Sequence, residues 1–229
     1  MPRTARIVVP DIPHHVTQSG NNGQDVFFVD EDRKVYLSLL KKHSERYGLE
    51  VLGWCLMTNH IHLIVRPALE EAMAKGIGRT HFRYTQYINR MHRRSGHLWQ
   101  NRFYSCPLGK IHFWRTLRYI EQNPLRARMV KSAANYKWSS AKAHLCFEDR
   151  SGLLNMNWWR QASARIDWKK VLQNSLPKEH VEQIRLNTNT GRPLADDSFI
   201  SKLETFVGRR LRPLPIGRPK TSDKKMINK

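Results

Sequence analysis

Cysteine, acidic residues and long apolar runs are all scarce in this 229-residue chain, and each scarcity excludes a class of protein. Its three cysteines, Cys55, Cys106 and Cys146, are odd in number and far apart, so neither a disulfide framework nor a cysteine zinc site is predicted. No run approaches the roughly 18 apolar residues of a transmembrane helix, and residues 1–6 have no apolar core of signal-peptide length. We therefore expect a cytoplasmic protein with no membrane partner.

The shortage of acidic residues leaves a large positive charge. Aspartate and glutamate number 19 against 40 lysines and arginines, which gives a formal net charge of +21. A field of this sign attracts polyanions and makes their binding depend on salt, so nucleic acid is the expected partner. A membrane-surface role would need a basic amphipathic helix or an apolar anchor, and the sequence shows neither. Hydrophobic residues make up 40% of the chain, which predicts a folded domain rather than a disordered one.

Hydrophobic spacing and turn residues predict alternating strands and helices in the first 135 residues. We expect strands at 12–19, 49–57, 60 to 66 and 98–108, and helices at 30–47, from about 68 to 93 and at 113–122. Asp30 is the expected N-cap of the first helix, and Gly48 its end. This order of elements predicts an α+β fold, in which an antiparallel sheet carries helices over one face.

The pattern is looser after residue 135. Tryptophans at 138, 158, 159 and 168 are expected to pack against the first domain, and a late helix is predicted at 197–207. Proline, glycine and basic residues after it indicate a mobile tail. We therefore divide the chain into a domain of residues 1–145, a helical extension of residues 146–207 and a basic flexible tail of residues 208–229.

Two histidines share one face of the strand that begins at residue 60. Side chains alternate along a strand, so His60 and His62 point one way while Ile61, Leu63 and Val65 point the other. Imidazole is the commonest nitrogen ligand of divalent metals, and a strand holds two of them rigidly. The pair is a candidate metal site. Two polar residues on a half-solvated strand would produce the same alternation.

A second candidate group lies about sixty residues downstream. Tyr119 and Asn123 are four residues apart at the end of a predicted helix, so they face the same way. A phenol can attack a phosphodiester and hold the product covalently, and an amide oxygen suits a hard cation such as Mg²⁺. A metal, a nucleophile and basic surroundings are the components of phosphoryl transfer. Taken singly, a tyrosine at the edge of a core and an asparagine at a helix end would explain both positions.

Five segments in this order resemble the REP-associated tyrosine transposases, relatives of the HUH single-tyrosine transposases of bacterial insertion sequences. They are TQSGNN at 17–22, MTNHIHLI at 57–64, GHLWQNRF at 96–103, RYIEQNPLRA at 118–127 and WSS at 138–140. The resemblance spans about residues 10–145, and GRPL at 191–194 and the basic tail also resemble the family. One departure is Ser19, which stands where the family pattern has arginine.

The resemblance implies a ferredoxin-like HUH endonuclease fold for residues 1–145. It implies that Tyr119 is the nucleophile and that His60, His62 and Asn123 bind Mg²⁺ or Mn²⁺. The implied activity is that of a transposase, which cleaves and rejoins single-stranded DNA hairpins of repetitive extragenic palindromes through a 5′-phosphotyrosine intermediate. By the same resemblance we expect a monomer that supplies its own tyrosine, rather than a dimer.

Arginines and aromatic residues near these positions are the predicted DNA contacts. Arginine suits phosphate oxygens and guanine edges, and aromatic rings stack on unpaired bases. The predicted contacts are Arg79, Arg83, Arg90, Trp99, Arg102, Phe103, Arg126, Arg128, Arg209, Arg210 and Arg212. A solvated surface charge would explain any single arginine, a hydrophobic core would explain Trp99, and a disordered tail would explain the last three.

Two other functions remain open at this level. The first is a DNA-binding protein on the same fold that no longer cuts, an alternative that the departure at Ser19 keeps open. The second is a metal-dependent phosphohydrolase that uses water. Such an enzyme would not need Tyr119, so its activity would survive the substitution Tyr119→Phe.

Overall fold

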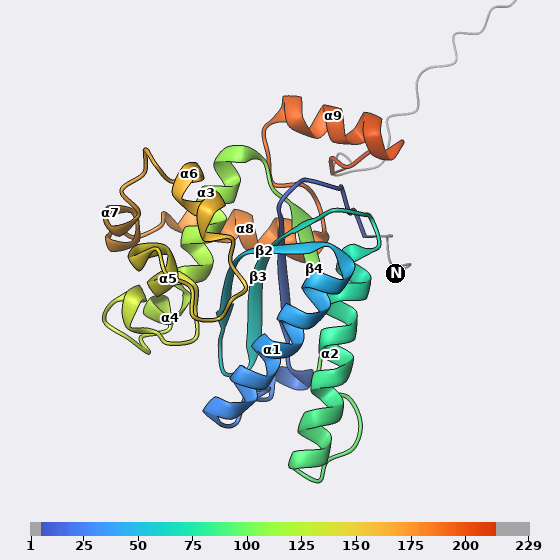
Figure 1. Ribbon diagram of the computed structural model, residues 1–229. Coiled ribbons are helices and arrows are strands. Elements are labelled where there is room, and N and C mark those ends of the chain that lie inside the picture. The colour runs from blue at the N-terminus through green and yellow to red at the C-terminus, as the bar shows by residue number, and fades with distance from the viewer. Residues whose placement is uncertain (1–5, 214–229) are drawn as a thin grey trace, which may run out of the picture.

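A four-stranded antiparallel sheet lies at the centre of the computed structural model, which describes residues 6–213 (Figure 1). The strands are β1 (His14–Ser19), β2 (Leu49–Leu56), β3 (His60–Pro67) and β4 (Tyr104–Pro107). Their spatial order is β2-β3-β1-β4, so β1 pairs with β3 on one side and with β4 on the other. The first strand of the chain therefore lies next to the strand that carries His60 and His62.

Helices cover both faces of this sheet. Helices α1 (Asp30–Tyr47) and α2 (Ala72–Met91) lie side by side over one face, and α3 (Lys110–Glu121) and α8 (Lys178–Thr190) contact the other (Figure 1). The expectation that helices cover only one face is therefore wrong. The reason is visible at Gly53 of β2, where an added Cβ would lie 2.4 Å from Leu117 of α3. The histidine face of the sheet is thus packed against a helix over part of its area.

The remaining helices are shorter. They are α4 (Asn123–Arg126), α5 (Ala141–Cys146), α6 (Met156–Ala162), α7 (Trp168–Gln173) and α9 (Asp197–Val207), and two 3₁₀ turns lie at Asn21–Gly23 and Ala133–Asn135. Trp159 and Trp168 pack against Trp114 of α3, with ring centroids 5.8 and 5.9 Å apart. These tryptophans belong to the same hydrophobic core as the sheet. The three predicted segments, with boundaries at 145 and 207, stay a prediction.

Helix α1 has the predicted span but a different N-terminal cap. Val29 is the N-cap residue and Asp30 is already helical. The carboxylate of Asp32 accepts hydrogen bonds from the backbone N–H groups of Phe28 (2.8 Å) and Val29 (3.0 Å), which satisfies donors that a helix start leaves open. Gly48 ends the helix with φ 64°, the left-handed conformation that glycine adopts without strain.

The extended segment predicted at 98–108 is a strand only from Tyr104 to Pro107. Asn101 has φ 61°, a left-handed conformation that a strand cannot contain. Instead, the loop before β4 is held to the end of β1: the N–H of Gln100 donates to the Ser19 carbonyl (2.9 Å), and the N–H of Asn21 donates to the Leu98 carbonyl (2.8 Å).

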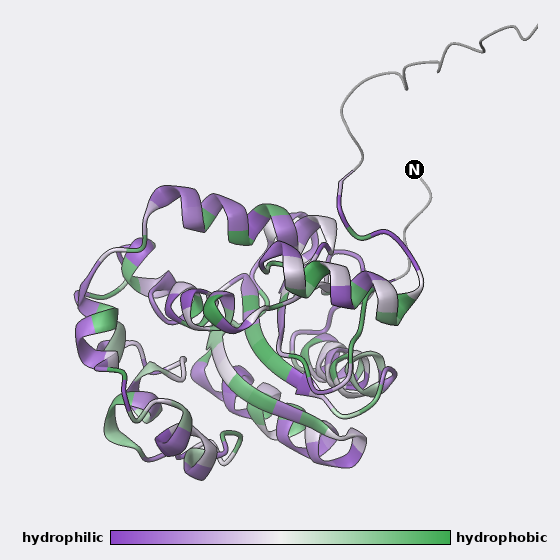
Figure 2. Ribbon diagram, turned by 90° about the horizontal axis from the view of Figure 1, so that it is seen from above, coloured by the Kyte–Doolittle hydropathy of each residue, from purple (hydrophilic) through white to green (hydrophobic). Residues whose placement is uncertain are grey.

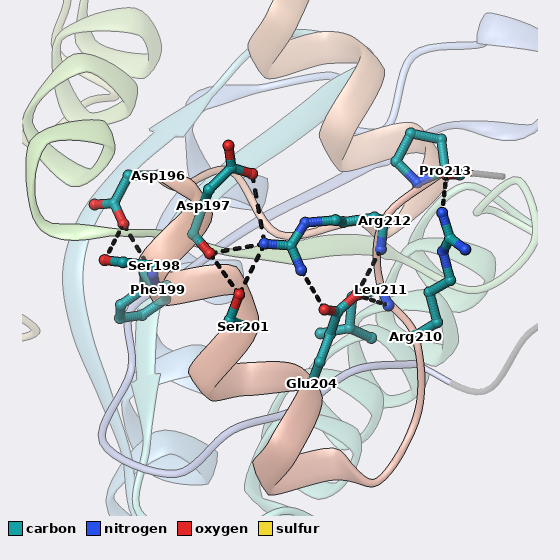
Figure 3. Close-up of polar contacts among 10 residues, drawn as sticks. All are labelled: Asp196, Asp197, Ser198, Phe199, Ser201, Glu204, Arg210, Leu211, Arg212 and Pro213. Atoms are coloured by element: carbon teal, nitrogen blue, oxygen red, sulfur yellow. Dashed lines mark hydrogen bonds and ion pairs between the residues drawn. The ribbon is translucent and has the colours of Figure 1, made fainter. Parts of the chain in front are cut away.

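Residues 208–213, the beginning of the predicted tail, lie against α9 (Figure 3). Arg212 forms an ion pair with Glu204 and donates to the carbonyl of Asp197 (2.8 Å). The backbone N–H of Leu211 donates to Glu204 (2.7 Å), and the Leu211 side chain is buried with Ile7 and other apolar residues. The rest of the predicted tail, residues 214–229, lies outside the described residues.

The distribution of hydropathy agrees with a layered fold. Figure 2 shows green stretches along the central strands and purple on the outer turns of the helices. Val16, Ile61, Leu63 and Val65 have no exposed surface, as expected for the apolar side of the central strands. Within residues 6–213, no helix is long and apolar enough to cross a membrane.

Candidate active site

His60 and His62 lie together on β3, on the face of the sheet opposite Ile61 and Leu63. Their ring centroids are 5.0 Å apart and the ring planes are nearly perpendicular. His62 is only 5% exposed, whereas His60 is half-buried at the start of the strand. The alternation of a strand thus presents the two imidazoles on one face of the sheet, the face that α3 partly covers.

Each of the two imidazoles has a partner on its Nδ1 atom. Nδ1 of His60 lies 2.7 Å from Oδ1 of Asn59, and Nδ1 of His62 lies 3.0 Å from Nε2 of His15. Burial lowers the pKa of His60 to about 4, with the charge of Arg185 adding to the effect, and burial holds the pKa of His62 well below its usual range. Both rings are therefore neutral near pH 7, and a neutral ring keeps a nitrogen lone pair for a ligand.

Tyr119 lies beside these histidines, in the last turn of α3. Its ring is 3% exposed and meets the ring of His62 edge-on at a centroid distance of 5.5 Å. The guanidinium carbon of Arg126 lies 4.3 Å from the centre of the Tyr119 ring, and Nε of Arg185 lies 3.5 Å from its hydroxyl oxygen. The phenol is thus flanked by two cationic side chains.

Asn123 begins α4, two residues after the last residue of α3, and completes the group. Its Nδ2 is 3.4 Å from Nε2 of His60, and its Oδ1 accepts a hydrogen bond from Nη2 of Arg126 (2.9 Å). The same Nη2 atom also donates to the carbonyl of Tyr119 (2.7 Å). Arg126 therefore links the helix end that carries Tyr119 to the residue that faces His60.

Two nitrogen atoms of Arg126 are left over. Nε and Nη1 are buried and have no hydrogen-bond partner in the described part of the chain. Burial lowers the pKa of this guanidinium. A buried donor without a partner costs folding free energy, and charged donors bind phosphate oxygens strongly. The unused donors of Arg126 therefore suit an anionic ligand beside Tyr119.

The residues present fit a divalent cation. No three His, Cys, Asp or Glu side chains gather as a metal site in residues 6–213, so the candidate set is the imidazoles of His60 and His62 and the amide of Asn123. Histidines that bind metal usually hold a partner on their second nitrogen, as both do here through Nδ1. Asn123 turns its oxygen toward Arg126, so rotation of the amide by half a turn would present that oxygen to the cation.

Two further residues of this site were not singled out from the sequence. His15 of β1 is 1% exposed and stacks on His62, with ring centroids 5.2 Å apart. Arg185 reaches Tyr119 from α8, a helix that we did not predict. The only sequence signal for His15 was its place in a predicted strand, and its neighbour across the sheet depends on the strand order. We call His60, His62, Tyr119, Asn123 and Arg126 the Tyr119 cluster.

A second polar cluster lies two residues further along α3. Glu121 has no exposed surface, and its Oε1 accepts from the Ser140 hydroxyl (2.5 Å) and from Nδ1 of His144 (2.6 Å). Its Oε2 accepts from the indole N–H of Trp168 (2.8 Å), and the ring of His144 stacks on Trp159 at 3.8 Å. We call these five residues the Glu121 cluster. It joins α3 to α5, α6 and α7.

The predicted DNA contacts are spread over several surfaces. Arg79, Arg83 and Arg90 are exposed on α2, Arg128 is exposed after α4, Arg126 belongs to the Tyr119 cluster, and Arg209, Arg210 and Arg212 follow α9. Trp99, Arg102 and Phe103 line one cleft of 440 Å³ beside α2. Trp99 is buried and stacks on His81 (4.5 Å), and the guanidinium of Arg6 covers the ring of Phe103 (3.6 Å). The role of each residue in DNA binding stays a prediction.

Residues 9–123 match a family model described as "Transposase IS200 like", and the match covers about half of the chain. The chain belongs to the IS200-like transposase family. It is therefore a member of a family of DNA-cleaving enzymes. Among functionally curated proteins, none matches its sequence.

A solved structure shows the fold of this IS200-like transposase. A REP-associated tyrosine transposase bound to a REP hairpin has a TM-score of 0.56 and 16% sequence identity, over 69% of this chain and 91% of that one. A protein of Deinococcus radiodurans named as a transposase has 19% identity over 53% of this chain and 97% of that one, with a TM-score of 0.37. The first likeness confirms the expected α+β HUH fold with its antiparallel sheet.

Proposed function

We propose that this transposase cleaves and rejoins single-stranded DNA hairpins of palindromic repeats, with Tyr119 as nucleophile and Mg²⁺ or Mn²⁺ as cofactor. The observation that carries the proposal is the position of the Tyr119 phenol, which lies between the imidazole of His62 and the guanidinium groups of Arg126 and Arg185. Hairpin DNA as substrate draws support from the net charge of +21 and from the related structure that is bound to a REP hairpin.

The proposed reaction exchanges one ester of phosphate for another. The phenol oxygen of Tyr119 attacks phosphorus, the bond from phosphorus to the 3′ oxygen breaks, and the phenol proton ends on that oxygen. The products are a 5′-phosphotyrosine and a free 3′-OH. A second 3′-OH can reverse the step without ATP, because the covalent bond to Tyr119 conserves the energy of the phosphodiester. The same chemistry therefore both cleaves and rejoins.

The cationic side chains of the site have separate parts in this reaction. Nε of Arg185 lies 3.5 Å from the phenol oxygen, so its charge stabilises the phenolate that attacks. The free Nε and Nη1 donors of Arg126 bind oxygens of the scissile phosphate, where negative charge develops in the transition state. His60, His62 and Asn123 would hold the cation, which would supply Lewis-acid polarisation of a phosphate oxygen.

One observation favours a second candidate, a DNA-binding protein on the same fold that no longer cuts. Ser19 stands where the family pattern has arginine, and it lies opposite His60 in the pairing of β1 with β3. The loop that borders the site thus lacks a guanidinium that the family pattern places there. The test below separates the two candidates.

The test is a denaturing gel that detects covalent protein–DNA adducts. Single-stranded hairpins from palindromes that flank the gene are incubated with the protein in Mg²⁺ or Mn²⁺. The wild-type protein is expected to give a shifted band that Tyr119→Phe loses, a decrease of at least about 1,000-fold. Tyr47→Phe is the matched control, because Tyr47 ends α1 on the other side of the sheet and should leave the adduct unchanged.

Each other outcome points to a different function. Hairpin binding without an adduct in either metal would support the DNA-binding protein that no longer cuts. Metal-dependent cleavage that survives Tyr119→Phe would support a phosphohydrolase that uses water, and it would overturn the role of Tyr119.

A further inference from the structure

His15 lies between His62 and helix α8, and hydrogen bonds connect all three. Nε2 of His15 is 3.0 Å from Nδ1 of His62, and Nδ1 of His15 is 2.7 Å from Oγ1 of Thr188 on α8. Oγ1 of Thr188 also lies 2.7 Å from the carbonyl oxygen of Ile184 and 3.4 Å from Sγ of Cys106. His15 and Thr188 are each 1% exposed, so these contacts exclude bulk water.

The single hydroxyl proton of Thr188 sets the direction of these bonds. The Ile184 carbonyl can only accept, so the hydroxyl donates to it, and Nδ1 of His15 then donates to Oγ1 of Thr188. In this arrangement one proton lies in each of the two 2.7 Å contacts of the Thr188 hydroxyl. If the hydroxyl instead donated to His15, the oxygens of Thr188 and Ile184 would face each other at 2.7 Å without a proton between them.

The direction of the bond between His15 and Thr188 also determines which ring nitrogen of His62 carries its proton. Neither partner of His15 is anionic, and a buried imidazole with no counter-charge is neutral, so it carries one proton, on Nδ1. Its Nε2 therefore accepts a hydrogen bond, and the donor is Nδ1 of His62. A neutral His62 with its proton on Nδ1 has a bare Nε2 with a free lone pair.

We propose that Thr188 is a positioning residue for the metal site: acting through His15, it holds His62 in the tautomer whose Nε2 can bind a cation. The cation in this statement rests on the proposed function, whereas the tautomer is a property of the metal-free protein. Helix α8 lies outside residues 9–123, the part that matches the family model. The helical extension thus contributes to a site that is built on the sheet.

The test removes the hydroxyl and follows both the tautomer and the metal. Thr188→Val keeps the volume of the side chain but leaves Nδ1–H of His15 without an acceptor. The proton of His15 is therefore expected to move to Nε2, and the proton of His62 is then expected to move from Nδ1 to Nε2. NMR of the ring nitrogens of labelled histidine in the metal-free protein reads this change directly. Titration with Mn²⁺ is expected to show binding about 10- to 100-fold weaker, as when the hydrogen bond that orients a metal-binding histidine is disturbed, because the change at His15 alters its bond with His62.

Two variants control for a merely structural effect. Thr188→Ser retains the hydroxyl and is expected to restore both the wild-type tautomer and the wild-type Mn²⁺ affinity. Thr190→Val alters an exposed threonine of the same helix, whose hydroxyl also bonds a backbone carbonyl (2.9 Å), and it should change neither measurement.

A wild-type His62 that carries its proton on Nε2 would overturn the proposal, and this measurement requires no variant. Unchanged nitrogen signals and unchanged Mn²⁺ affinity in a folded Thr188→Val protein would also overturn it. If the tautomer changes as expected but the wild-type protein binds no Mn²⁺, the hydrogen-bond chain is supported and the metal site of the proposed function is refuted.

Discussion

Tyr119 and Glu121 are two residues apart on α3, and the clusters named after them differ in how completely their polar atoms are hydrogen-bonded. Both oxygens of Glu121 accept hydrogen bonds of 2.5 to 2.8 Å, and the residue has no exposed surface. In the Tyr119 cluster, by contrast, Nη2 of Arg126 makes bonds of 2.7 and 2.9 Å, but Asn123 lies 3.4 Å from His60 and two donors of Arg126 have no partner in the described chain. The contact of the Tyr119 hydroxyl with Arg185, which lies outside the cluster, is also long, at 3.5 Å.

This difference separates a scaffold from a site. A buried polar group whose bonds are all made stabilises one arrangement of the chain and offers nothing to a ligand. Polar groups with unused bonding capacity cost folding free energy, and a ligand can recover that cost. We infer that the Glu121 cluster holds the end of α3 in place, whereas the Tyr119 cluster is left open for substrate.

The largest expected effect on stability comes from Glu121. In Glu121→Gln an amide N–H₂ replaces one acceptor oxygen and faces a donor of Ser140, His144 or Trp168. The free energy of unfolding should fall by roughly 3 kcal/mol in urea denaturation. Tyr119→Phe should change it by less than about 1 kcal/mol, since the contact of its hydroxyl with Arg185 is long, at 3.5 Å.

Glu148→Gln is the control for this prediction, because Glu148 is exposed and its contact with Arg150 is 3.4 Å long. If Glu121→Gln were as stable as this control, the distinction between scaffold and site along α3 would fail.

Arg126 should show the opposite behaviour from Glu121. Arg126→Met removes a partly buried charge with two unbonded donors, which favours folding, but it also removes the hydrogen bonds of Nη2 to Asn123 and to the Tyr119 carbonyl, which opposes folding. These effects should largely offset each other, so the free energy of unfolding should stay within about 1 kcal/mol of wild type. Cleavage of hairpin DNA should fall by about 100-fold, the usual loss when one donor to a charged transition state is removed. Single-turnover cleavage and urea denaturation measure the two quantities. Arg165→Met, at an exposed position between α6 and α7 that is not a predicted DNA contact, should change neither quantity. An equal loss of cleavage in that variant would mean that Arg126 contributes only its positive charge, as any surface arginine would.

A smaller effect on the free energy of unfolding is expected when the pH is lowered, and it tests how the Tyr119 cluster contributes to stability. The folded pKa of His60 is about 4, below its ordinary value of 6.5, because burial penalises the charged ring. Between about pH 6.5 and pH 4 the unfolded chain thus binds the extra proton. The contribution of His60 to stability is therefore complete above about pH 6.5 and is lost as the pH falls, by roughly 1 kcal/mol per pH unit.

Urea denaturation in a chelating buffer, from pH 7 to about pH 4.5, measures this dependence. His60→Gln should make it less steep, and a substitution of the exposed His97 serves as the control. An identical slope in His60→Gln and wild type would show that His60 does not titrate on unfolding.

Local patterns predicted much of this molecule because they depend on near neighbours. Alternation placed His60 and His62 on one face, and periodicity with Gly48 at the end predicted the span of α1. Helix α8 was missed although Val181, Ile184 and Thr188 repeat at helical spacing on its buried side. The residues between them are polar, so the apolar stripe was too narrow to be recognised.

The role of Glu121 could not be predicted either. A glutamate close to the candidate nucleophile in the sequence would be interpreted as a catalytic acid or as a surface acid. It is buried because Ser140, His144 and Trp168, from later in the chain, pack around it. The covering of the second face of the sheet could not be predicted either. The polar side of the histidine strand alone would predict exposure to solvent, but α3 and α8 pack against that face.

Residue types and short spacings were sufficient for the positive charge, the strand of histidines, the tyrosine with its asparagine and the resemblance to a transposase family, since each is encoded within a few neighbouring residues or in bulk composition. The placement of β1 between β3 and β4 came from packing instead, and with it the contacts of His15 with His62 and Thr188. His15 is 47 positions from His62 and 173 positions from Thr188 in the sequence, and no local propensity acts over such separations. Burial of a shared core brings them together.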